Sequence, residues 1–235
     1  MAYTNIKRND GFGAQLQSII STIIYCDINN VEFKYSKFTS IEHNYDSDPD
    51  YVEKLEDFIN ISKTYPLATD EPALHNWLTW TENNIDIIQD FPVLDKLRNI
   101  FHKDKVNIFD TSFYNIAVHI RRPNIHDNRI DGTDTTDSHF LNAIAKLSEI
   151  YREKNIKFHI YSQGNIDDFS LYKNDTTKLH INENIIDTFT GLTQADVLVT
   201  SRSSFSYIAG FLNRNTIYYT PFWHRPLSNW NVIPI

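Results

Sequence analysis

The hydrophobic residues of this 235-residue chain change their spacing near residue 113. Before that point, apolar side chains recur at intervals of three and four residues, which is typical of helices with one buried face. The clearest stripe runs from Leu16 to Ile24, and similar patterns predict helices over 51–61, 72–80 and 92–101. A short alternating run, Val31–Tyr35, predicts a strand after the first helix.

After residue 113, apolar runs of strand length alternate with helical stripes. Strands are predicted over 114–120, 157–163, 178–181, 196–201 and 216–219, and helices around 140–151, 185–192 and 205–212. This order implies a parallel sheet with crossover helices, and therefore an α/β fold class. It divides the chain into an N-terminal lobe (1–112), a C-terminal Rossmann-like lobe (113–221) and an aromatic tail (222–235) expected to pack back on the N-terminal lobe.

Charge and composition exclude several kinds of partner. The net charge of −8 argues against nucleic acid or an anionic membrane. The first residues lack the apolar run of a signal peptide, and no stretch reaches the ~18 apolar residues that a membrane span needs. Cys26 is the one cysteine, which excludes an intrachain disulfide and a cysteine-based zinc cluster. We therefore expect a soluble, cytoplasmic protein.

Two adjacent arginines, Arg121 and Arg122, follow the predicted strand 114–120. Parallel sheets bind ligands at the carboxyl ends of their strands. Guanidinium groups suit phosphate oxygens there because they offer several fixed donors and stay charged. Surface ion pairs with the many acids of the chain are the alternative, and the strand by itself favours neither interpretation.

A glycine-rich segment, residues 10–15 (Asp-Gly-Phe-Gly-Ala-Gln), opens the first predicted helix. Glycines let backbone N–H groups approach a ligand, toward which the positive end of the helix dipole points. A tight turn without a ligand would use glycines equally well. The dinucleotide-binding fingerprint is incomplete, because its third glycine is absent.

The run Arg202-Ser203-Ser204-Phe205-Ser206 follows the predicted strand 196–201 and begins a helix. Serines cap helix N-termini, and they also hold phosphates together with the N–H groups of the first turn. Three serines and an arginine within five residues exceed what one cap needs, which favours the phosphate.

No metal site and no cofactor are predicted. Asp46, Asp48 and Asp50 lack the glycine and glutamate of an EF-hand at the required offsets. Capping of the helix that follows explains these carboxylates better.

Three motifs, in this order, resemble the GDP-fucose-dependent fucosyltransferase superfamily, which includes α-1,2-, α-1,6- and protein O-fucosyl branches. They are residues 11–17 (Gly-Phe-Gly-Ala-Gln-Leu-Gln), 119–122 (His-Ile-Arg-Arg) and 196–211. The resemblance implies a metal-independent enzyme of GT-B architecture, with two Rossmann-like lobes, parallel sheets and a ligand cleft between the lobes. In place of the Gly-Asp or Thr-Asp that usually follows His-x-Arg-Arg, this chain has Pro123-Asn124. The acid function is thereby lost or passed to Asp127.

The resemblance also implies roles for individual residues. Arg121 would contact the β-phosphate of the donor with help from Arg122, and Asp196 and the serines would hold the nucleotide and its phosphates. The donor-binding candidates are Gly11, Phe12, Gly13, Gln15, His119, Arg121, Arg122, Ser162, Asp196, Ser201, Arg202, Ser203, Ser204 and Phe205. The catalytic candidates are Arg121 as charge stabiliser and, as general base, Asp10, His43 or its neighbour Glu42, and Asp127.

These residues favour an inverting glycosyltransferase that moves fucose or a related deoxysugar from a GDP-linked donor to a glycan hydroxyl. The alternative is a non-catalytic nucleotide-sugar or glycan-binding module, suggested by the missing acid after Arg122. A sugar phosphatase or kinase is disfavoured because the chain lacks a Walker loop and a paired-carboxylate metal site. An Asp-x-Asp-dependent transferase is disfavoured because no apolar strand leads into such a motif.

Overall fold

The computed structural model describes residues 1–123 and 135–233 and divides the chain into two compact units. Unit 1 comprises Met1–Lys105 and Arg225–Asn229, and unit 2 comprises Val106–His224 and the segment from Trp230. None of the helices in the described residues combines the length and the apolar character that crossing a bilayer requires.

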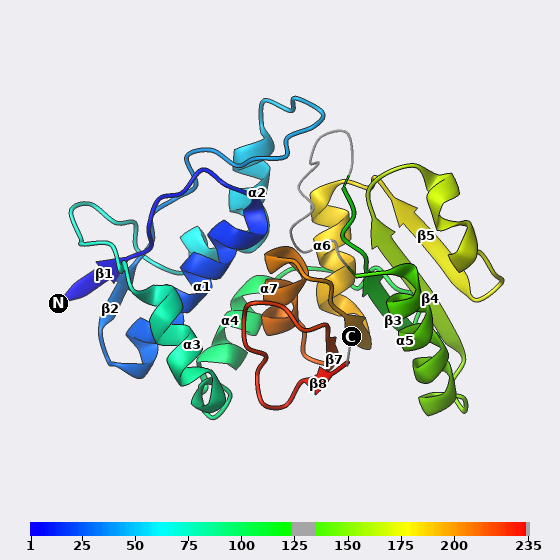
Figure 1. The fold of residues 1–235 in the computed structure, drawn as a ribbon. Coiled ribbons are helices and arrows are strands. Elements are labelled where there is room, and N and C mark those ends of the chain that lie inside the picture. Colours follow the sequence, from blue (N-terminus) through cyan, green and yellow to red (C-terminus); the bar gives the residue numbers. More distant parts are fainter. Residues whose placement is uncertain (124–134, 234–235) are drawn as a thin grey trace. The chain divides into compact units, whose positions relative to one another are not determined.

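Unit 1 is built around a βαβ element (Figure 1). β1 (Ala2–Thr4) and β2 (Glu32–Lys34) are parallel neighbours, and α1 (Phe12–Ile28) connects them. The apolar stripe of α1 is fully buried, with Leu16, Ile20 and Ile24 at most 1% exposed. The remaining elements of unit 1 are α2 (Tyr51–Ile59), the 3-10 turn Ile61–Lys63, α3 (Trp77–Ile88) and α4 (Val93–His102).

The helix predicted over 72–80 is wrong at its start, because the backbone there extends the pairing of β1. Thr4 donates its N–H to the carbonyl of Pro72 at 3.1 Å, and Leu74 donates to the carbonyl of Thr4 at 2.9 Å. α3 therefore begins only at Trp77. The hydrophobic pattern also did not reveal β1, whose three residues are too few to show an alternation.

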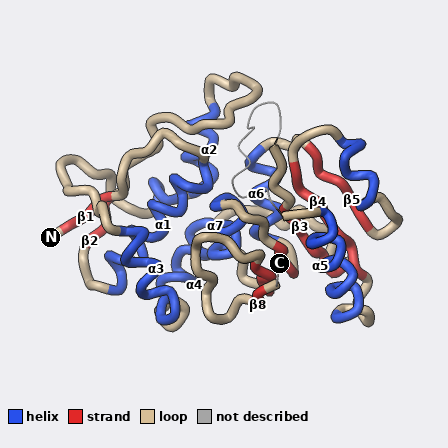
Figure 2. Tube along the Cα trace, viewed as in Figure 1, coloured by secondary structure: helices blue, strands red, loops and turns tan. Residues whose placement is uncertain are grey.

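Unit 2 contains a six-stranded sheet in the order β5-β4-β3-β6-β7-β8, with every neighbouring pair parallel (Figures 1 and 2). Numbered within this unit, the order is 3-2-1-4-5-6, which is the order of doubly wound nucleotide-binding sheets. The α/β class with parallel sheets is thus confirmed. The strands are β3 (Tyr114–His119), β4 (Ile156–Ser162), β5 (Thr177–Ile181), β6 (Val197–Val199), β7 (Thr216–Tyr219) and β8 (Asn231–Val232).

Helices cover both faces of this sheet. α5 (Asp137–Ile150) and the 3-10 segment η2 (Ile166–Tyr172) pack on the face that carries Ile116, Val118 and Ile160. α6 (Ile185–Gln194) approaches the other face so closely that a Cβ on Gly191 would lie 2.1 Å from the Tyr161 hydroxyl. α7 (Ser204–Leu212) follows β6 and contacts the end of β3 through Phe205 and His119, whose ring centroids lie 5.5 Å apart.

The chain after β7 is shared between the two units. Residues 225–229 group with unit 1, where the Arg225 guanidinium binds both carboxylate oxygens of Asp86 at 2.8 and 2.9 Å. Trp230 lies in unit 2 against α7, where a Cβ on Gly210 would meet its ring at 2.8 Å. β8 then adds the last strand to the sheet beside β7.

Hydrogen bonds connect three buried polar side chains across β3, β4 and β5 and end at the exposed Glu183. His159 Nε2 lies 3.1 Å from Asn115 Oδ1, His159 Nδ1 lies 2.9 Å from His180 Nε2, and His180 Nδ1 lies 2.7 Å from Glu183 Oε1. Burial lowers the pKa of His159 to about 3, and the neighbouring His180, Lys178 and Lys157 add to the effect. His159 therefore stays neutral in the folded protein at neutral pH.

We expect the free energy of unfolding to fall as the pH drops below about 6.5. The unfolded chain protonates His159 near its ordinary pKa of 6.5, whereas the folded chain resists protonation down to about 3. The stability is fully present above 6.5 and is lost toward pH 3, at up to about 1.4 kcal/mol per pH unit. Urea unfolding between pH 7.5 and 4.5 measures this slope.

His159→Gln should flatten this slope, while His75→Gln, which alters an exposed histidine of unit 1, should preserve it. An unchanged slope in His159→Gln would show that other groups dominate the acid sensitivity.

Candidate functional site

The carboxyl ends of β3 and β6 meet where the strand order of unit 2 reverses, which is where such sheets bind ligands. His119 ends β3, and Ser201 follows β6. His119 Nδ1 and Ser201 Oγ lie 2.8 Å apart and form a hydrogen bond between the two strand ends. Ser206 of α7 fixes Ser201 further, because its hydroxyl accepts the Ser201 N–H at 3.1 Å.

Burial and the positive charge of Arg121 together lower the pKa of His119 to about 3. The imidazole is therefore neutral at neutral pH, and its role at this edge is to hold Ser201 in position. Arg121 itself follows the last residue of β3 by two positions.

Ser203 is the N-cap of α7, with its hydroxyl accepting the Phe205 N–H at 3.3 Å. The simple capping interpretation of Ser203 therefore holds, and the first turn of α7 points its positive end toward the same edge. Arg202 joins this edge to the next strand, since its Nε donates to the carbonyl of Pro221 at 3.0 Å, just after β7. The positive charge of Arg202 and burial both lower the pKa of His139, with burial the larger cause.

Arg122 has a partner that the sequence did not indicate. Its Nη2 forms an ion pair with Asp137 at the start of α5, and its guanidinium lies 4.6 Å from the ring centroid of Phe169. The hydroxyl of Tyr172 donates to the same carboxylate oxygen of Asp137 at 2.6 Å. The side chain of Arg122 is thus held against α5 and η2.

Two further candidates, Ser162 and Asp196, lie away from the His119–Ser201 edge or have another role there. Ser162 lies at the edge, but its hydroxyl donates to the carbonyl of Ile120 at 2.7 Å and so supports the backbone before Arg121. Asp196 lies at the opposite, amino-terminal edge of the sheet, where it accepts the Asn115 N–H at 2.7 Å. β6 therefore separates Asp196 from Ser201 and the serines that follow it. Asp127 lies outside the described residues.

The glycine segment of unit 1 lies at the carboxyl end of β1, as the βαβ element requires. Gly11 is the N-cap of α1 and supplies no side-chain cap, whereas Gly13 already belongs to the first turn of the helix. Phe12 is 2% exposed and packs in the core. Gln15 is also buried, and its Nε2 donates to the carbonyls of Asp10 and Ser40 at 2.6 and 2.8 Å. The side chains of Phe12 and Gln15 thus stabilise the conformation of the glycine segment. Its backbone N–H groups are therefore the candidate groups for binding a ligand.

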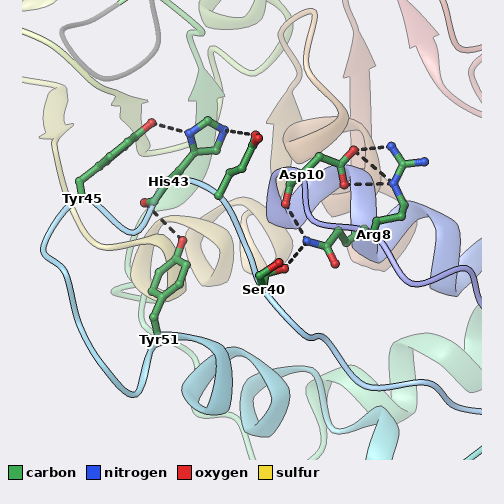
Figure 3. Close-up of polar contacts among 8 residues, drawn as sticks. Arg8, Asp10, Ser40, His43, Tyr45 and Tyr51 are labelled. Carbon is green, nitrogen blue, oxygen red and sulfur yellow. Dashed lines mark hydrogen bonds and ion pairs between the residues drawn. The ribbon is translucent and has the colours of Figure 1, made fainter.

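His43 belongs to the segment after β2, which Gln15 ties to the glycine segment (Figure 3). Its Nδ1 lies 2.8 Å from the Tyr45 hydroxyl, and its Nε2 lies 3.9 Å from a carboxylate oxygen of Glu42. The edge of the ring formed by Cδ2 and Nε2 also faces Gly11, where an added Cβ would lie 3.2 Å from both atoms. Asp10, in contrast, is paired with Arg8, whose Nε donates to its carboxylate at 3.0 and 3.2 Å.

Two kinds of chemistry follow from these arrangements. The edge of unit 2 combines Arg121, Arg202, serine hydroxyls and a helix N-terminus, which together suit a diphosphate. The edge of unit 1 presents a histidine beside backbone N–H groups, which suits proton transfer to or from a hydroxyl. Within 1–123 and 135–233, no group of three His, Cys, Asp or Glu side chains is arranged to hold a metal ion.

Several residues of these sites carry no clear signal in the sequence. In the sequence Asp137 is recognisable only as the cap of a helix, and its ion pair with Arg122 joins residues that are 15 positions apart. Tyr45 is one aromatic residue among many, and only its 2.8 Å contact with His43 distinguishes it. Ser206 could have been found, because it belongs to the same serine-rich run as Ser203.

Comparison with protein-family models gives no match for this chain. No curated protein matches it either. Solved structures do match: NodZ α-1,6-fucosyltransferase co-crystallised with GDP is 12% identical, with a TM-score of 0.41 over 90% of this chain and 92% of that chain. Fucosyltransferase NodZ from Bradyrhizobium is 11% identical, with a TM-score of 0.40 over 90% and 93%. POFUT1 in complex with GDP-fucose is 15% identical, with a TM-score of 0.34 over 100% of this chain and 74% of that chain.

Proposed function

We propose that this chain is an inverting, metal-independent glycosyltransferase that moves fucose or a related deoxysugar from a GDP-linked donor to a glycan hydroxyl. The observation that carries the proposal is the hydrogen bond of 2.8 Å between His119 and Ser201 at the reversal point of a 3-2-1-4-5-6 parallel sheet, where α7 also begins. Arg121 follows His119 by two residues, and we propose that its guanidinium serves this same point. Such a reversal point is the general ligand site of open α/β sheets. Arginine charges complement the negative charge of a diphosphate, and serine hydroxyls can donate hydrogen bonds to its oxygens.

In the proposed reaction, the acceptor oxygen forms a bond to the anomeric carbon while the bond from that carbon to the β-phosphate oxygen breaks. The nucleoside diphosphate leaves with the electron pair, and the configuration at the anomeric carbon inverts. Arg121 and the N-terminus of α7 stabilise the negative charge that grows on the leaving group, which is the role that a metal ion would otherwise take. The proton of the acceptor hydroxyl passes to a general base, for which we propose His43.

A thermal-shift panel with GDP, UDP, GDP-fucose and UDP-glucose tests the donor. We expect GDP and GDP-fucose to raise the unfolding temperature by several degrees, because ligand at about 100 times its Kd stabilises a protein by about 2.7 kcal/mol. EDTA should leave the shift unchanged. Stabilisation by UDP alone would overturn the choice of nucleotide.

The same samples separate catalysis from binding when released GDP is quantified by chromatography after incubation with GDP-fucose and a mixture of oligosaccharides. Faster release of GDP in the presence of the oligosaccharides than in their absence supports transfer. A thermal shift without any release would indicate the non-catalytic nucleotide-sugar-binding module instead.

A further inference from the structure

Two aromatic rings, Phe222 and Trp223, stack on each other directly after β7. Their ring centroids lie 4.3 Å apart with an interplanar angle of 29°. Trp223 is 68% exposed, although an indole of this size is usually buried. An exposed and stacked pair of rings forms a flat apolar surface, which we call the Phe222–Trp223 platform.

The backbone beneath the platform is held from two sides. Tyr219, which is 3% exposed, accepts the Phe222 N–H on its hydroxyl at 3.0 Å and donates that hydroxyl to the carbonyl of His224. Arg202 donates to the carbonyl of Pro221 at 3.0 Å. The platform is therefore ordered before any ligand arrives, and binding to it does not have to order a loose loop.

The platform also lies beside the proposed diphosphate site. β7 pairs in parallel with β6, so the segment after β7 emerges at the same edge of the sheet as Ser201 and Ser203. Arg202 connects the two segments directly through its hydrogen bond to Pro221. The segment that carries Trp223 therefore begins at the same edge of the sheet as the proposed diphosphate site.

We propose that the Phe222–Trp223 platform binds a pyranose ring of a neutral saccharide acceptor; this inference rests on the proposed function. One face of a pyranose is lined by C–H groups, which pack against an indole, while its hydroxyls remain in water. The net charge of −8 favours a neutral saccharide over an acidic one. A nucleobase could also stack on an indole, but recognition of its polar edge requires fixed partners that an open surface does not supply.

Saturation-transfer NMR tests this proposal with lactose, N-acetyllactosamine and chitotetraose as probes. With the wild-type protein, we expect saturation of the ring protons on one face of at least one saccharide. Trp223→Ala should weaken that binding about tenfold, which corresponds to about 1.4 kcal/mol. Trp223→Tyr, which keeps an aromatic face, should recover part of the affinity. Leu171→Ala, which removes another apolar side chain that is 64% exposed, should bind like the wild type.

The thermal shift caused by GDP is measured on the same variants. We expect it to be unchanged in Trp223→Ala. Loss of the GDP shift in that variant would make the platform a nucleobase site and overturn the proposal. The proposal also fails if no saccharide is saturated, or if saturation is equal in Trp223→Ala. Saccharide binding at Trp223 without any GDP shift would refute the proposed donor and leave the platform assignment standing.

Discussion

Replacement of Arg121 by alanine should lower kcat for sugar transfer by about 10³-fold, because an arginine that stabilises a leaving phosphate contributes rate factors of this size. Arg121 follows β3 at the reversal point of the sheet, and its charge already acts on the adjacent His119. Arg121→Lys should retain part of the activity, because lysine keeps the charge and loses the planar fork of donors. The measurement is GDP release from GDP-fucose in the presence of acceptor.

The matched control for this prediction is Arg152→Ala. Arg152 is an arginine of the same unit, its side chain is 65% exposed, and it pairs with Glu149 at 2.7 Å. Exposed pairs of this kind contribute at most about 1 kcal/mol to stability, so the control should turn over normally. Wild-type kcat in Arg121→Ala, with an unchanged circular dichroism spectrum, would defeat the assignment of Arg121 to the leaving phosphate.

The second half of the fold follows from the sequence because its strands are buried on both faces. Stretches such as 116–118 and 197–199 are therefore continuous apolar runs that differ clearly from the helical stripes between them. The first half of the fold is harder to predict from the sequence, because β1 and β2 have only three residues each and much of the unit is irregular. Residues 72–74 look like a helix start, yet their backbone pairs with Thr4 instead.

The part of the candidate site that lies at the ends of strands could be predicted from the sequence. His119 and Ser201 belong to two motifs at the ends of predicted strands, and the structure joins them by a hydrogen bond of 2.8 Å. The motif that contains Asp196 does not show that a residue before a strand lies at the opposite edge of the sheet from a residue after it. The partnership of Arg122 with Asp137 depends on tertiary structure that local sequence does not encode.

His43 combines three features that ordinary loop residues lack. Its backbone has a φ of +72°, a conformation that costs a non-glycine residue of order 1–3 kcal/mol and is often found at functional sites. Its Nδ1 is held by the Tyr45 hydroxyl, and the carbonyl of His43 accepts a long hydrogen bond from Tyr51 at 3.5 Å. Its side chain is 29% exposed. The ring is therefore accessible to solvent although the Tyr45 hydroxyl holds it in place. Asp10 is the weaker candidate for the base because Arg8 already pairs with its carboxylate.

His43→Ala should therefore lower kcat for transfer by about 10²- to 10⁴-fold, the usual contribution of a general base, and leave the thermal shift with GDP unchanged. Tyr45→Phe should have a smaller effect, because it removes the hydrogen bond that orients the ring and keeps the base itself. His75→Ala, at an exposed histidine of the same unit, is the control and should resemble the wild type. Normal transfer by His43→Ala would return the choice of base to Asp10 and Asp127. Loss of the GDP shift together with transfer would instead make His43 a donor-binding residue, because a base for the acceptor acts after the donor is bound.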